Sequence, residues 1–342
     1  MKIALIVNPL IPVPPDKYGG IERIVFMLIQ YLKKNGHKVT LYANKHSQSG
    51  CNLVGYTESD KYGVQDFLKI NLLTARIAFR GYGLVHTFGR MSNIALLMPA
   101  GLPKIVSYQL PPTLTQVQKA VQIARKNTLY FTACSNFIGD QIEPYGHVTT
   151  IYNGVDINDY DYNATVSTDA PLVFLGRIQQ EKGTAIAIQV AKQAGKKLII
   201  AGNIPNEALH QQYFEEQVKP YIDNQLISYI GPVNNHQKND LLKNAAALLM
   251  PVTWDEPFGI VMAEALACGT PVIGFNRGAI PEVVSNGTNG FICSTLDEMV
   301  TAVKEIPALE RHACRQIAEE KFSADILGAQ YETLYRQIIT KN

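Results

Sequence analysis

The sequence lacks several features that would fix its class directly. No run of about 18 or more apolar residues occurs, so we expect no membrane-spanning helix. The five cysteines are odd in number and widely scattered, which argues against a disulfide framework or a zinc site and is typical of reduced thiols in a cytoplasm. Basic residues are spread out and no nucleic-acid recognition motif occurs, so we expect no nucleic acid partner.

The composition is that of an ordinary globular protein. With 342 residues, 46% hydrophobic and 18% charged, the chain is long enough for two domains and a sizeable core. The N-terminal stretch MKIALIVNPLIPVPPD is apolar, but Asn8 and four prolines interrupt it and no small-residue cleavage site follows. We therefore interpret it as a first buried strand and not as a signal peptide.

Charge is distributed unevenly along the chain. Residues 1–155 carry 16 Lys+Arg and 7 Asp+Glu, a balance of +9, which leaves 15 basic and 22 acidic residues, a balance of −7. A basic N-terminal half could steer an anionic acceptor or contact an anionic membrane surface. Solubilising charge without a partner is the alternative. The predicted location is cytoplasmic, with peripheral contact at the inner face of the membrane as a further expectation.

Short apolar runs alternate with helical patterns in the N-terminal half. Strands are expected at Lys2–Asn8, Lys38–Ala43, Leu84–Phe88, Lys104–Tyr108, Leu129–Ala133 and His147–Tyr152, and helices at Gly20–Leu32, Val64–Phe79 and Leu114–Lys126. This alternation favours a parallel sheet with helices on both faces.

The alternation stops at a polar, aperiodic segment, residues 157–170, and then restarts. Strands are expected at Leu172–Gly176, Lys197–Ala201, Leu226–Ile230, Ala247–Met250 and Pro271–Phe275, and helices at Gly183–Ala194, Asn206–Lys219, Lys238–Asn244, Gly259–Ala267 and Leu296–Glu305, followed by a C-terminal pair. We predict two α/β domains, 1–156 and 157–322, with a final helix over 323–342 returning to the first. Two such sheets facing each other would form a cleft at the carboxyl ends of their strands.

The stretch from Trp254 to Glu282, WDEPFGIVMAEALACGTPVIGFNRGAIPE, is the most informative. Glu256 precedes a predicted helix, and Glu264 lies eight residues later within it. A carboxylate can accept two hydroxyl hydrogen bonds, so it suits a sugar diol. Helix capping for Glu256 and a surface position for Glu264 are the structural alternatives.

A second stretch, GRIQQEKG over residues 176–183, places two cations around a strand-to-helix loop. Arg177 ends the predicted strand and Lys182 precedes the predicted helix. Arg offers a planar fork for phosphate oxygens, Lys a point charge, and the helix N-terminus oriented N–H groups. A solvated loop without ligand is the alternative.

Together these two stretches closely resemble family 4 glycosyltransferases, retaining enzymes built on two facing Rossmann-like domains, the glycosyltransferase B fold. The resemblance implies that Arg177 and Lys182 clamp the donor diphosphate. It also implies that Glu256 contacts hydroxyls of the donor sugar, that Glu264 contacts the ribose, and that the amides of Phe258, Gly259 and Ile260 open a helix toward sugar and phosphate.

Weaker matches extend the resemblance over nearly the whole chain. Gly19 and Gly20 match the family's N-domain glycine loop, which closes over diphosphate and acceptor, and Gly231-Pro232-Val233 matches the loop near the base. The pattern also departs from the family. His86 takes the first place of a His-x-His motif and Phe88 the second, while Gln109 follows the next strand where the family often has His. His86 is as consistent with a satisfied core residue as with a sugar contact.

No metal or other cofactor is expected. Asp159 and Asp161 have the spacing of metal-dependent glycosyltransferases of the other fold, but they lie in the polar segment and we interpret the match as chance. No other cluster has metal-ligand spacing, and the cationic pair takes the place of a metal in this interpretation.

The sequence therefore predicts a retaining hexosyltransferase. It would move a hexose from a nucleotide-diphosphate sugar, with UDP as the expected nucleotide, to a sugar, lipid-linked or small-molecule acceptor in cell-surface glycan or glycoconjugate synthesis. The resemblance implies front-face substitution, in which the departing phosphate accepts the acceptor's proton. A nucleotide-sugar epimerase on the same scaffold and a non-catalytic nucleotide-sugar binding subunit remain the alternatives.

Overall fold

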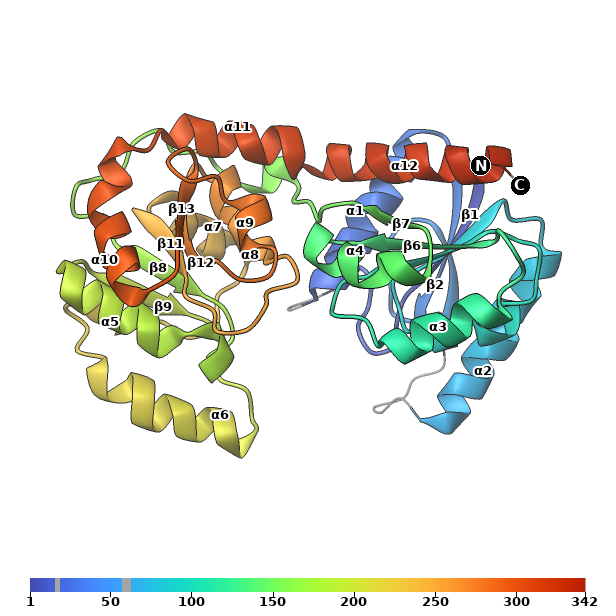
Figure 1. Cartoon of the computed structure of the whole chain (residues 1–342), viewed down its shortest axis with the longest axis horizontal. Coiled ribbons are helices and arrows are strands. Elements are labelled where there is room, and N and C mark those ends of the chain that lie inside the picture. The colour runs from blue at the N-terminus through green and yellow to red at the C-terminus, as the bar shows by residue number, and fades with distance from the viewer. Residues whose placement is uncertain (16–18, 57–62, 342) are drawn as a thin grey trace. The chain divides into compact units, whose positions relative to one another are not determined.

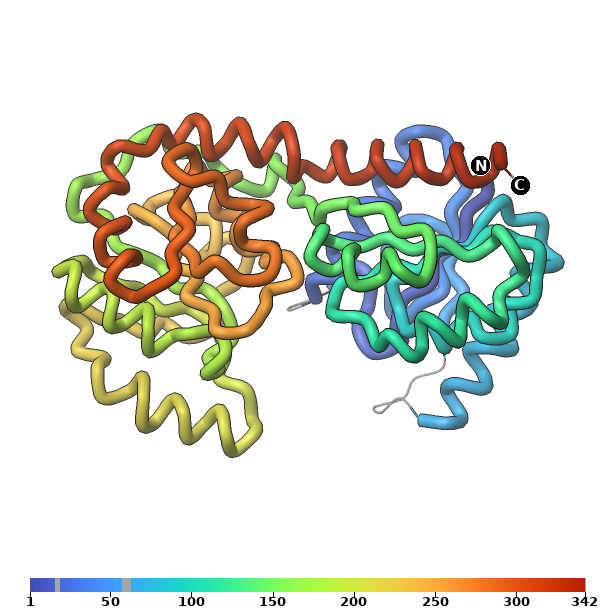
Figure 2. Tube along the Cα trace, viewed as in Figure 1, coloured from blue at the N-terminus to red at the C-terminus, as the bar shows by residue number. Residues whose placement is uncertain are grey.

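The computed structural model describes residues 1–15, 19–56 and 63–341. Within these the chain forms two compact units (Figures 1 and 2). The N-terminal unit comprises Met1–Gly154 and the chain from Ala324 onward, and the C-terminal unit comprises Val155–Ser323. The expected division fell after Asp156. At the observed one, the Val155 N–H donates to the Phe322 carbonyl at 2.8 Å, so the entering and leaving segments of the C-terminal unit pair with each other.

The N-terminal unit is built on a parallel seven-stranded sheet. Its strands are β1 (Lys2–Ile6), β2 (Lys38–Asn44), β3 (Asn52–Tyr56), β4 (Leu84–Thr87), β5 (Lys104–Tyr108), β6 (Leu129–Ala133) and β7 (Val148–Thr150), in the order β3-β2-β1-β4-β5-β6-β7. The central β1 is a continuous apolar run and is buried on both faces, as covered parallel strands require. The edge strand β3, largely exposed, was not predicted because only its last residue is buried.

Helices cover this sheet. They are α1 (Gly20–Lys34), α2 (Val64–Ala75), α3 (Leu114–Ile123), α4 (Asn136–Ile142) and α12 (Ala324–Lys341), with 3₁₀ turns η1 (Arg76–Phe79) and η2 (Met91–Leu97). The predicted helix over 64–79 is thus an α-helix that ends in a 3₁₀ turn. The C-terminal α12 packs on α1 so closely that a Cβ on Gly328 would lie 2.1 Å from the Tyr31 ring. A larger residue there would separate the two helices.

The C-terminal unit repeats this architecture with six parallel strands. They are β8 (Leu172–Leu175), β9 (Leu198–Ala201), β10 (Ile227–Tyr229), β11 (Ala247–Met250), β12 (Val272–Phe275) and β13 (Gly290–Cys293), in the order β10-β9-β8-β11-β12-β13. The short β13 was not predicted. In both units the first strand lies inside the sheet and the order reverses beside it, which places the usual ligand position at the carboxyl ends of the central strands.

The helices of this unit are α5 (Thr184–Ala194), α6 (Ala208–Tyr213), α7 (Asn235–Lys243), α8 (Ile260–Ala267), α9 (Ile280–Val283), α10 (Leu296–Glu305) and α11 (Arg311–Lys321). Helix α7 begins three residues before the predicted start because Asn234 and Gln237 form a capping box. No helix in the described ranges combines the length and the apolarity that crossing a bilayer requires.

Candidate functional site at the strand ends of the C-terminal unit

The loop after β8 is fixed by its backbone. The Ile178 N–H donates to the Asn203 carbonyl at 2.9 Å, and η5 (Gln180–Lys182) leads into α5. Gly183 has φ 78°, and a Cβ there would lie 1.9 Å from the Pro251 carbonyl oxygen. Only glycine fits this approach, so α5 begins directly against the end of β11. The loop therefore presents Arg177 and Lys182 at the carboxyl edge of the sheet.

Three neighbouring loops are joined there by their backbones. The Gly202 N–H donates to the Gly231 carbonyl at 2.9 Å, and a Cβ on Gly202 would lie 1.7 Å from the Gly176 carbonyl oxygen. The loops after β8, β9 and β10 are thus in contact. Gly231 and Val233, both partly exposed, lie on the last of them.

Lys182 meets Glu256 at the centre of this edge. Lys182 Nζ lies 2.7 Å from Glu256 Oε2, with side-chain exposures of 17% and 10%. Trp254 donates its Nε1–H to the same oxygen at 3.0 Å, and Lys182 Nζ lies 4.4 Å from the centroid of the indole ring. The structure brings together two predicted site residues that lie 74 positions apart. Trp254 was quoted in the motif, but its role as a partner of both charges was not predicted.

The backbone of Glu256 is held by the loop after β12. The Ala279 N–H donates to the Glu256 carbonyl at 2.8 Å. Gly278 has φ 55°, and a Cβ there would lie 2.3 Å from the same oxygen. The backbone that carries the Glu256 carboxylate is therefore fixed by contact between the loops after β11 and β12.

Helix α8 opens immediately beyond Glu256. Gly259 is its N-cap with φ 75°, so the helix begins at Ile260, one residue after the expected start. The Phe258 side chain is buried and packs edge-on against Phe322 at 5.8 Å between ring centroids. Phe258 is therefore a core side chain, and any contact to a ligand would come from its backbone.

Glu264 lies on the buried face of α8 and is not at the surface. It is 6% exposed, pairs with Lys238 on α7, and accepts a hydrogen bond from the Tyr160 hydroxyl at 2.9 Å. Both contacts reach the same oxygen, Oε1. Neither partner was predicted, since Lys238 is one lysine among many and Tyr160 lies in the polar segment.

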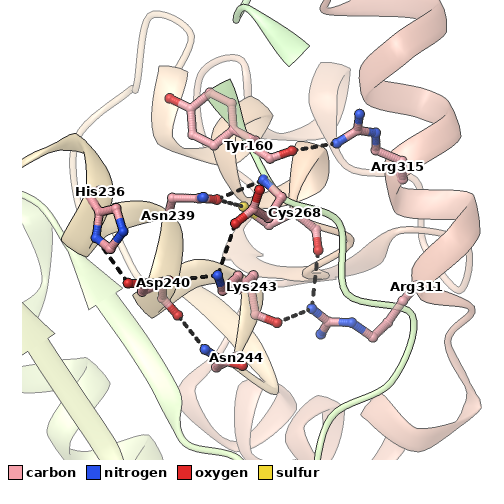
Figure 3. A network of polar contacts seen from close by, with 10 residues as sticks. Tyr160, His236, Asn239, Asp240, Lys243, Asn244, Cys268, Arg311 and Arg315 are labelled. Carbon is pink, nitrogen blue, oxygen red and sulfur yellow. Dashed lines mark hydrogen bonds and ion pairs between the residues drawn. The ribbon is translucent and has the colours of Figure 1, made fainter. Parts of the chain in front are cut away.

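The polar segment after the domain boundary is part of the C-terminal unit. Asp161 accepts from Lys243 Nζ at 3.0 Å, and its N–H donates to Asn239 Oδ1 at 3.0 Å. Arg315 Nη1 donates to the Tyr160 carbonyl at 2.9 Å, and Figure 3 shows these contacts joining the segment to α7 and α11. The hydrogen bond from Lys243 lowers the pKa of Asp161. Of the two aspartates of the Asp-x-Asp match, Asp161 is thus in an ion pair with Lys243.

Arg177 contrasts with Lys182. It is exposed, and within the described part of the chain no acidic side chain pairs with it. The loop after β8 therefore carries one exposed cation, Arg177, and one cation, Lys182, that is paired with Glu256 of the loop after β11. Within the described residues no group of three metal-ligating side chains occurs.

The predicted N-terminal residues have a different environment. His86 is 0% exposed; its Nδ1 lies 2.5 Å from the Tyr335 hydroxyl and its Nε2 2.6 Å from Ser107 Oγ. Burial lowers its pKa from 6.5 to about 3, so the ring is neutral. Phe88 is 3% exposed, with its ring 4.2 Å from that of His86.

This environment favours packing roles for the two side chains, and their possible sugar contacts stay a prediction. The structure supports the core interpretation of His86, because both ring nitrogens are occupied and α12 covers the ring. Phe88 is likewise a packing residue. Gln109 is half-buried at the end of β5 and accepts from Asn153 Nδ2 at 2.7 Å.

The glycine pair of the N-terminal unit starts α1. A Cβ on Gly19 would lie 2.6 Å from Pro15 Cβ and 2.9 Å from Glu22 Oε2, so a residue with a side chain would clash. Gly20 is the first residue of the helix. Burial raises the pKa of Glu22.

The fold is that of two-domain glycosyltransferases of the B type. Solved structures share the architecture: AviGT4, a glycosyltransferase involved in avilamycin A biosynthesis, is 24% identical with TM-score 0.74, covering 100% of this chain and 98% of that one. A glycosyltransferase from Rickettsia africae ESF-5 is 18% identical with TM-score 0.82, covering 100% and 99%. Anabaena Alr3699/HepE, solved in complex with UDP and glucose, is 20% identical with TM-score 0.74, covering 98% and 99%. The predicted fold is confirmed.

The family follows from sequence. The family model for glycosyl transferases group 1 matches residues 161–321, and that for glycosyltransferase family 4 matches residues 18–159. The two models together match most of the chain, which belongs to the glycosyltransferase family that they describe.

Curated relatives are 22% to 30% identical to this chain. Glycogen synthase of Mycobacterium tuberculosis is 30% identical over 209 residues, 56% of this chain and 49% of the relative. N-acetyl-alpha-D-glucosaminyl L-malate synthase of Bacillus anthracis is 25% identical, over 58% of this chain and 56% of the relative. The chain thus spans about half the length of these relatives. A putative glycosyltransferase of Bacillus subtilis, YtcC, is 22% identical over 99% of this chain and 93% of its own length.

Proposed function

We propose that this chain transfers a hexosyl group from a nucleotide-diphosphate sugar to an acceptor hydroxyl with retention of configuration. The observation that supports this most is the contact between Lys182 and Glu256 beside the exposed Arg177. This arrangement provides cations for a phosphate and an acid for sugar hydroxyls at one strand edge. The C-terminal unit would then bind the donor, and the N-terminal unit the acceptor.

The chemistry follows from where charge develops. As the bond between the anomeric carbon and the diphosphate oxygen breaks, negative charge gathers on the departing phosphate. Arg177 and Lys182 would stabilise that charge, with the guanidinium offering a fork and the ammonium a point charge. The acceptor oxygen would attack from the same face, and its proton would pass to the departing phosphate oxygen.

Lys182 would exchange partners when the donor binds. In the structure it is paired with Glu256 and packed on Trp254. A phosphate would draw the ammonium away, and the freed Glu256 oxygen would accept hydroxyl hydrogen bonds from the sugar. Donor binding would thus assemble both halves of the site, and the pair would keep the carboxylate compensated until then.

Glu264 would anchor the ribose, oriented by Lys238 and Tyr160. The backbone N–H groups at the start of α8, from Phe258 to Ile260, would face the sugar and phosphate. Gly231 and Val233 would lie near the base, and Gly19 and Gly20 would take the role of the diphosphate-binding glycine loop that the family resemblance implies.

UDP is our proposed donor nucleotide. The support is indirect, since it rests on the solved neighbour whose structure contains UDP and glucose. The acceptor would be a sugar, lipid-linked or small-molecule hydroxyl in glycan or glycoconjugate synthesis. We place the reaction in the cytoplasm. The five cysteines, all among the described residues, form no disulfide, which supports a reducing compartment.

The test is a turnover assay across UDP-, GDP-, ADP- and TDP-sugars, with and without a panel of acceptor hydroxyl compounds. A transferase releases the nucleoside diphosphate continuously. Release is slow when water is the only acceptor and faster when an acceptor hydroxyl compound is added. An epimerase would instead convert the donor to its isomer without releasing nucleotide. Saturable nucleotide-sugar binding without any turnover would favour the binding subunit and would contradict the proposal. NMR of the transferred sugar's anomeric proton decides retention.

A further inference from the structure

Helix α2 and the following η1 expose an unusual row of large apolar side chains. Val64 is 77% exposed, Leu68 55%, Leu72 60% and Phe79 92%. The first three recur every fourth residue and so lie along one face of the helix. We call Val64, Leu68, Leu72 and Phe79 the α2 apolar row. Single exposed apolar residues are common, but four along one segment call for an explanation.

The row lies on a different side of α2 from the residues that hold the helix to its unit. Ile70, Asn71 and Thr74 are buried, and Asn71 Nδ2 donates to the Ser92 carbonyl at 2.9 Å while Thr74 Oγ1 donates to the Asn93 carbonyl at 2.8 Å. These contacts join α2 to η2 and fix which side faces outward. Figure 1 shows α2 at the periphery of the N-terminal unit. The row is therefore a stable feature of the folded unit.

Cations border the row. Lys69, Arg76 and Arg80 are exposed along the same segment, and Lys2 donates to the Arg80 carbonyl. The single acid between Gly63 and Gly83 is Asp66, whose Oδ2 accepts the Gly63 N–H at 2.9 Å at the helix start. Over residues 63–83, exposed cations therefore outnumber acidic side chains beside the row.

We infer that the α2 apolar row and its cations bind the surface of a bilayer that contains anionic phospholipid. Apolar side chains would enter the boundary between headgroups and acyl chains, while Lys69, Arg76 and Arg80 would contact lipid phosphates. This inference does not depend on the proposed transfer reaction. It assigns to one segment what the charge of the N-terminal half indicates only in general.

A second copy of this chain fits the same surface less well. A two-fold dimer places a patch against itself, so the cations bordering the row would face like charges across the interface. A water-excluding contact would also have to bury them without acidic partners. An anionic membrane satisfies both the apolar and the cationic groups at once.

Cosedimentation of the full chain with vesicles tests the inference. We expect binding to vesicles of phosphatidylcholine with about one-third phosphatidylglycerol, weak binding to phosphatidylcholine alone, and a decline as salt shortens the screening length. Leu68→Ser combined with Leu72→Ser should lower the partition coefficient by about tenfold or more, because it removes two apolar contacts. Lys69→Glu combined with Arg76→Glu should cause a comparable loss and weaken the salt dependence.

The matched control is Leu209→Ser, since Leu209 on α6 is 68% exposed in the C-terminal unit. It should bind as the unaltered chain does, and circular dichroism should show all variants folded. The inference is wrong if the Leu68/Leu72 variant binds normally, or if Leu209→Ser loses as much. Vesicle binding that is absent throughout, with self-association that the Leu68/Leu72 variant abolishes, would assign the row to a dimer and also overturn it.

Discussion

The two units share one architecture and differ in what their strand ends carry. In the C-terminal unit, Glu256 pairs with Lys182 between two loops at the carboxyl edge of the sheet, and Glu264 pairs with Lys238 between helices α8 and α7. In the N-terminal unit, His86 within β4 is neutral and buried beneath α12. The two sheets thus share a topology, and among these residues only the C-terminal one has a lysine–glutamate pair in the loops at its carboxyl edge.

The two units also differ in the charge and the exposed apolar side chains of their surfaces. The N-terminal half is basic and most of the exposed large apolar side chains in the described ranges lie in its unit, whereas the C-terminal half is acidic. We connect the first surface with a membrane and the second unit with a small anionic donor. The following experiments test whether this division of roles is real.

Removal of the clamp cations should have the largest effect. Arg177→Ala or Lys182→Ala should reduce turnover by about two to four orders of magnitude, because contacts to the developing phosphate charge are lost. Steady-state rates of nucleotide release measure this. Lys192→Ala is the matched control, since Lys192 is exposed on α5 in the same unit and should be dispensable. Equal rates for all three variants and the unaltered chain would remove the clamp from the account.

Breaking the buried ion pair between Lys238 and Glu264 should lower the stability of the C-terminal unit. Lys238→Met leaves Glu264 buried without its cation and should lower the free energy of unfolding by about 3–5 kcal/mol. Removing both charges, as in Lys238→Met with Glu264→Leu, should recover part of that loss. Urea denaturation gives both values. A single variant as stable as the unaltered chain would show that the pair is not a structural element of this unit.

The N-terminal unit should instead respond to pH through His86. Its folded pKa is about 3, against an ordinary value of 6.5. Between these values the unfolded chain binds a proton that the folded chain does not, so stability is fully present above pH 6.5 and is lost as pH falls. The expected loss from this group is about 1 kcal/mol between pH 6.5 and 5.5. The free energies of unfolding of the unaltered chain and of His86→Asn, plotted against pH, should therefore converge over that interval. A constant difference between the two would contradict the assignment.

Chelation should have the smallest effect. If Arg177 and Lys182 neutralise the departing phosphate, activity should persist in excess chelator after dialysis. The measurement is turnover before and after treatment, with added Mg²⁺ or Mn²⁺ as the comparison. Loss of activity that a divalent cation restores would mean that the cationic pair does not act alone.

Much of the fold was predictable because buried parallel strands are short apolar runs between helical patterns. β1 and β11 are such runs, and both were placed correctly. The edge strand β3 and the four-residue β13 were missed, since the first is mostly exposed and the second depends on pairing with β12. Helix ends shifted where side-chain caps decided them, as at Asn234.

The candidate site residues differ in the same way in how far the sequence could predict them. Arg177, Lys182 and Glu256 were predicted because each lies in a contiguous motif. Lys238 and Tyr160 were missed because their only signal is tertiary: they meet Glu264 across 26 and 104 positions of the chain. His86 could not be decided from sequence, since the residues that occupy its ring nitrogens, Ser107 and Tyr335, lie 21 and 249 positions away.

A crystal structure with UDP bound tests the central claim most directly. We expect the diphosphate oxygens within hydrogen-bond distance of Arg177 and Lys182, the ribose hydroxyls on Glu264, and Lys182 turned from Glu256 toward phosphate. Phosphates bound away from both cations, with the contact between Lys182 and Glu256 intact, would contradict the account.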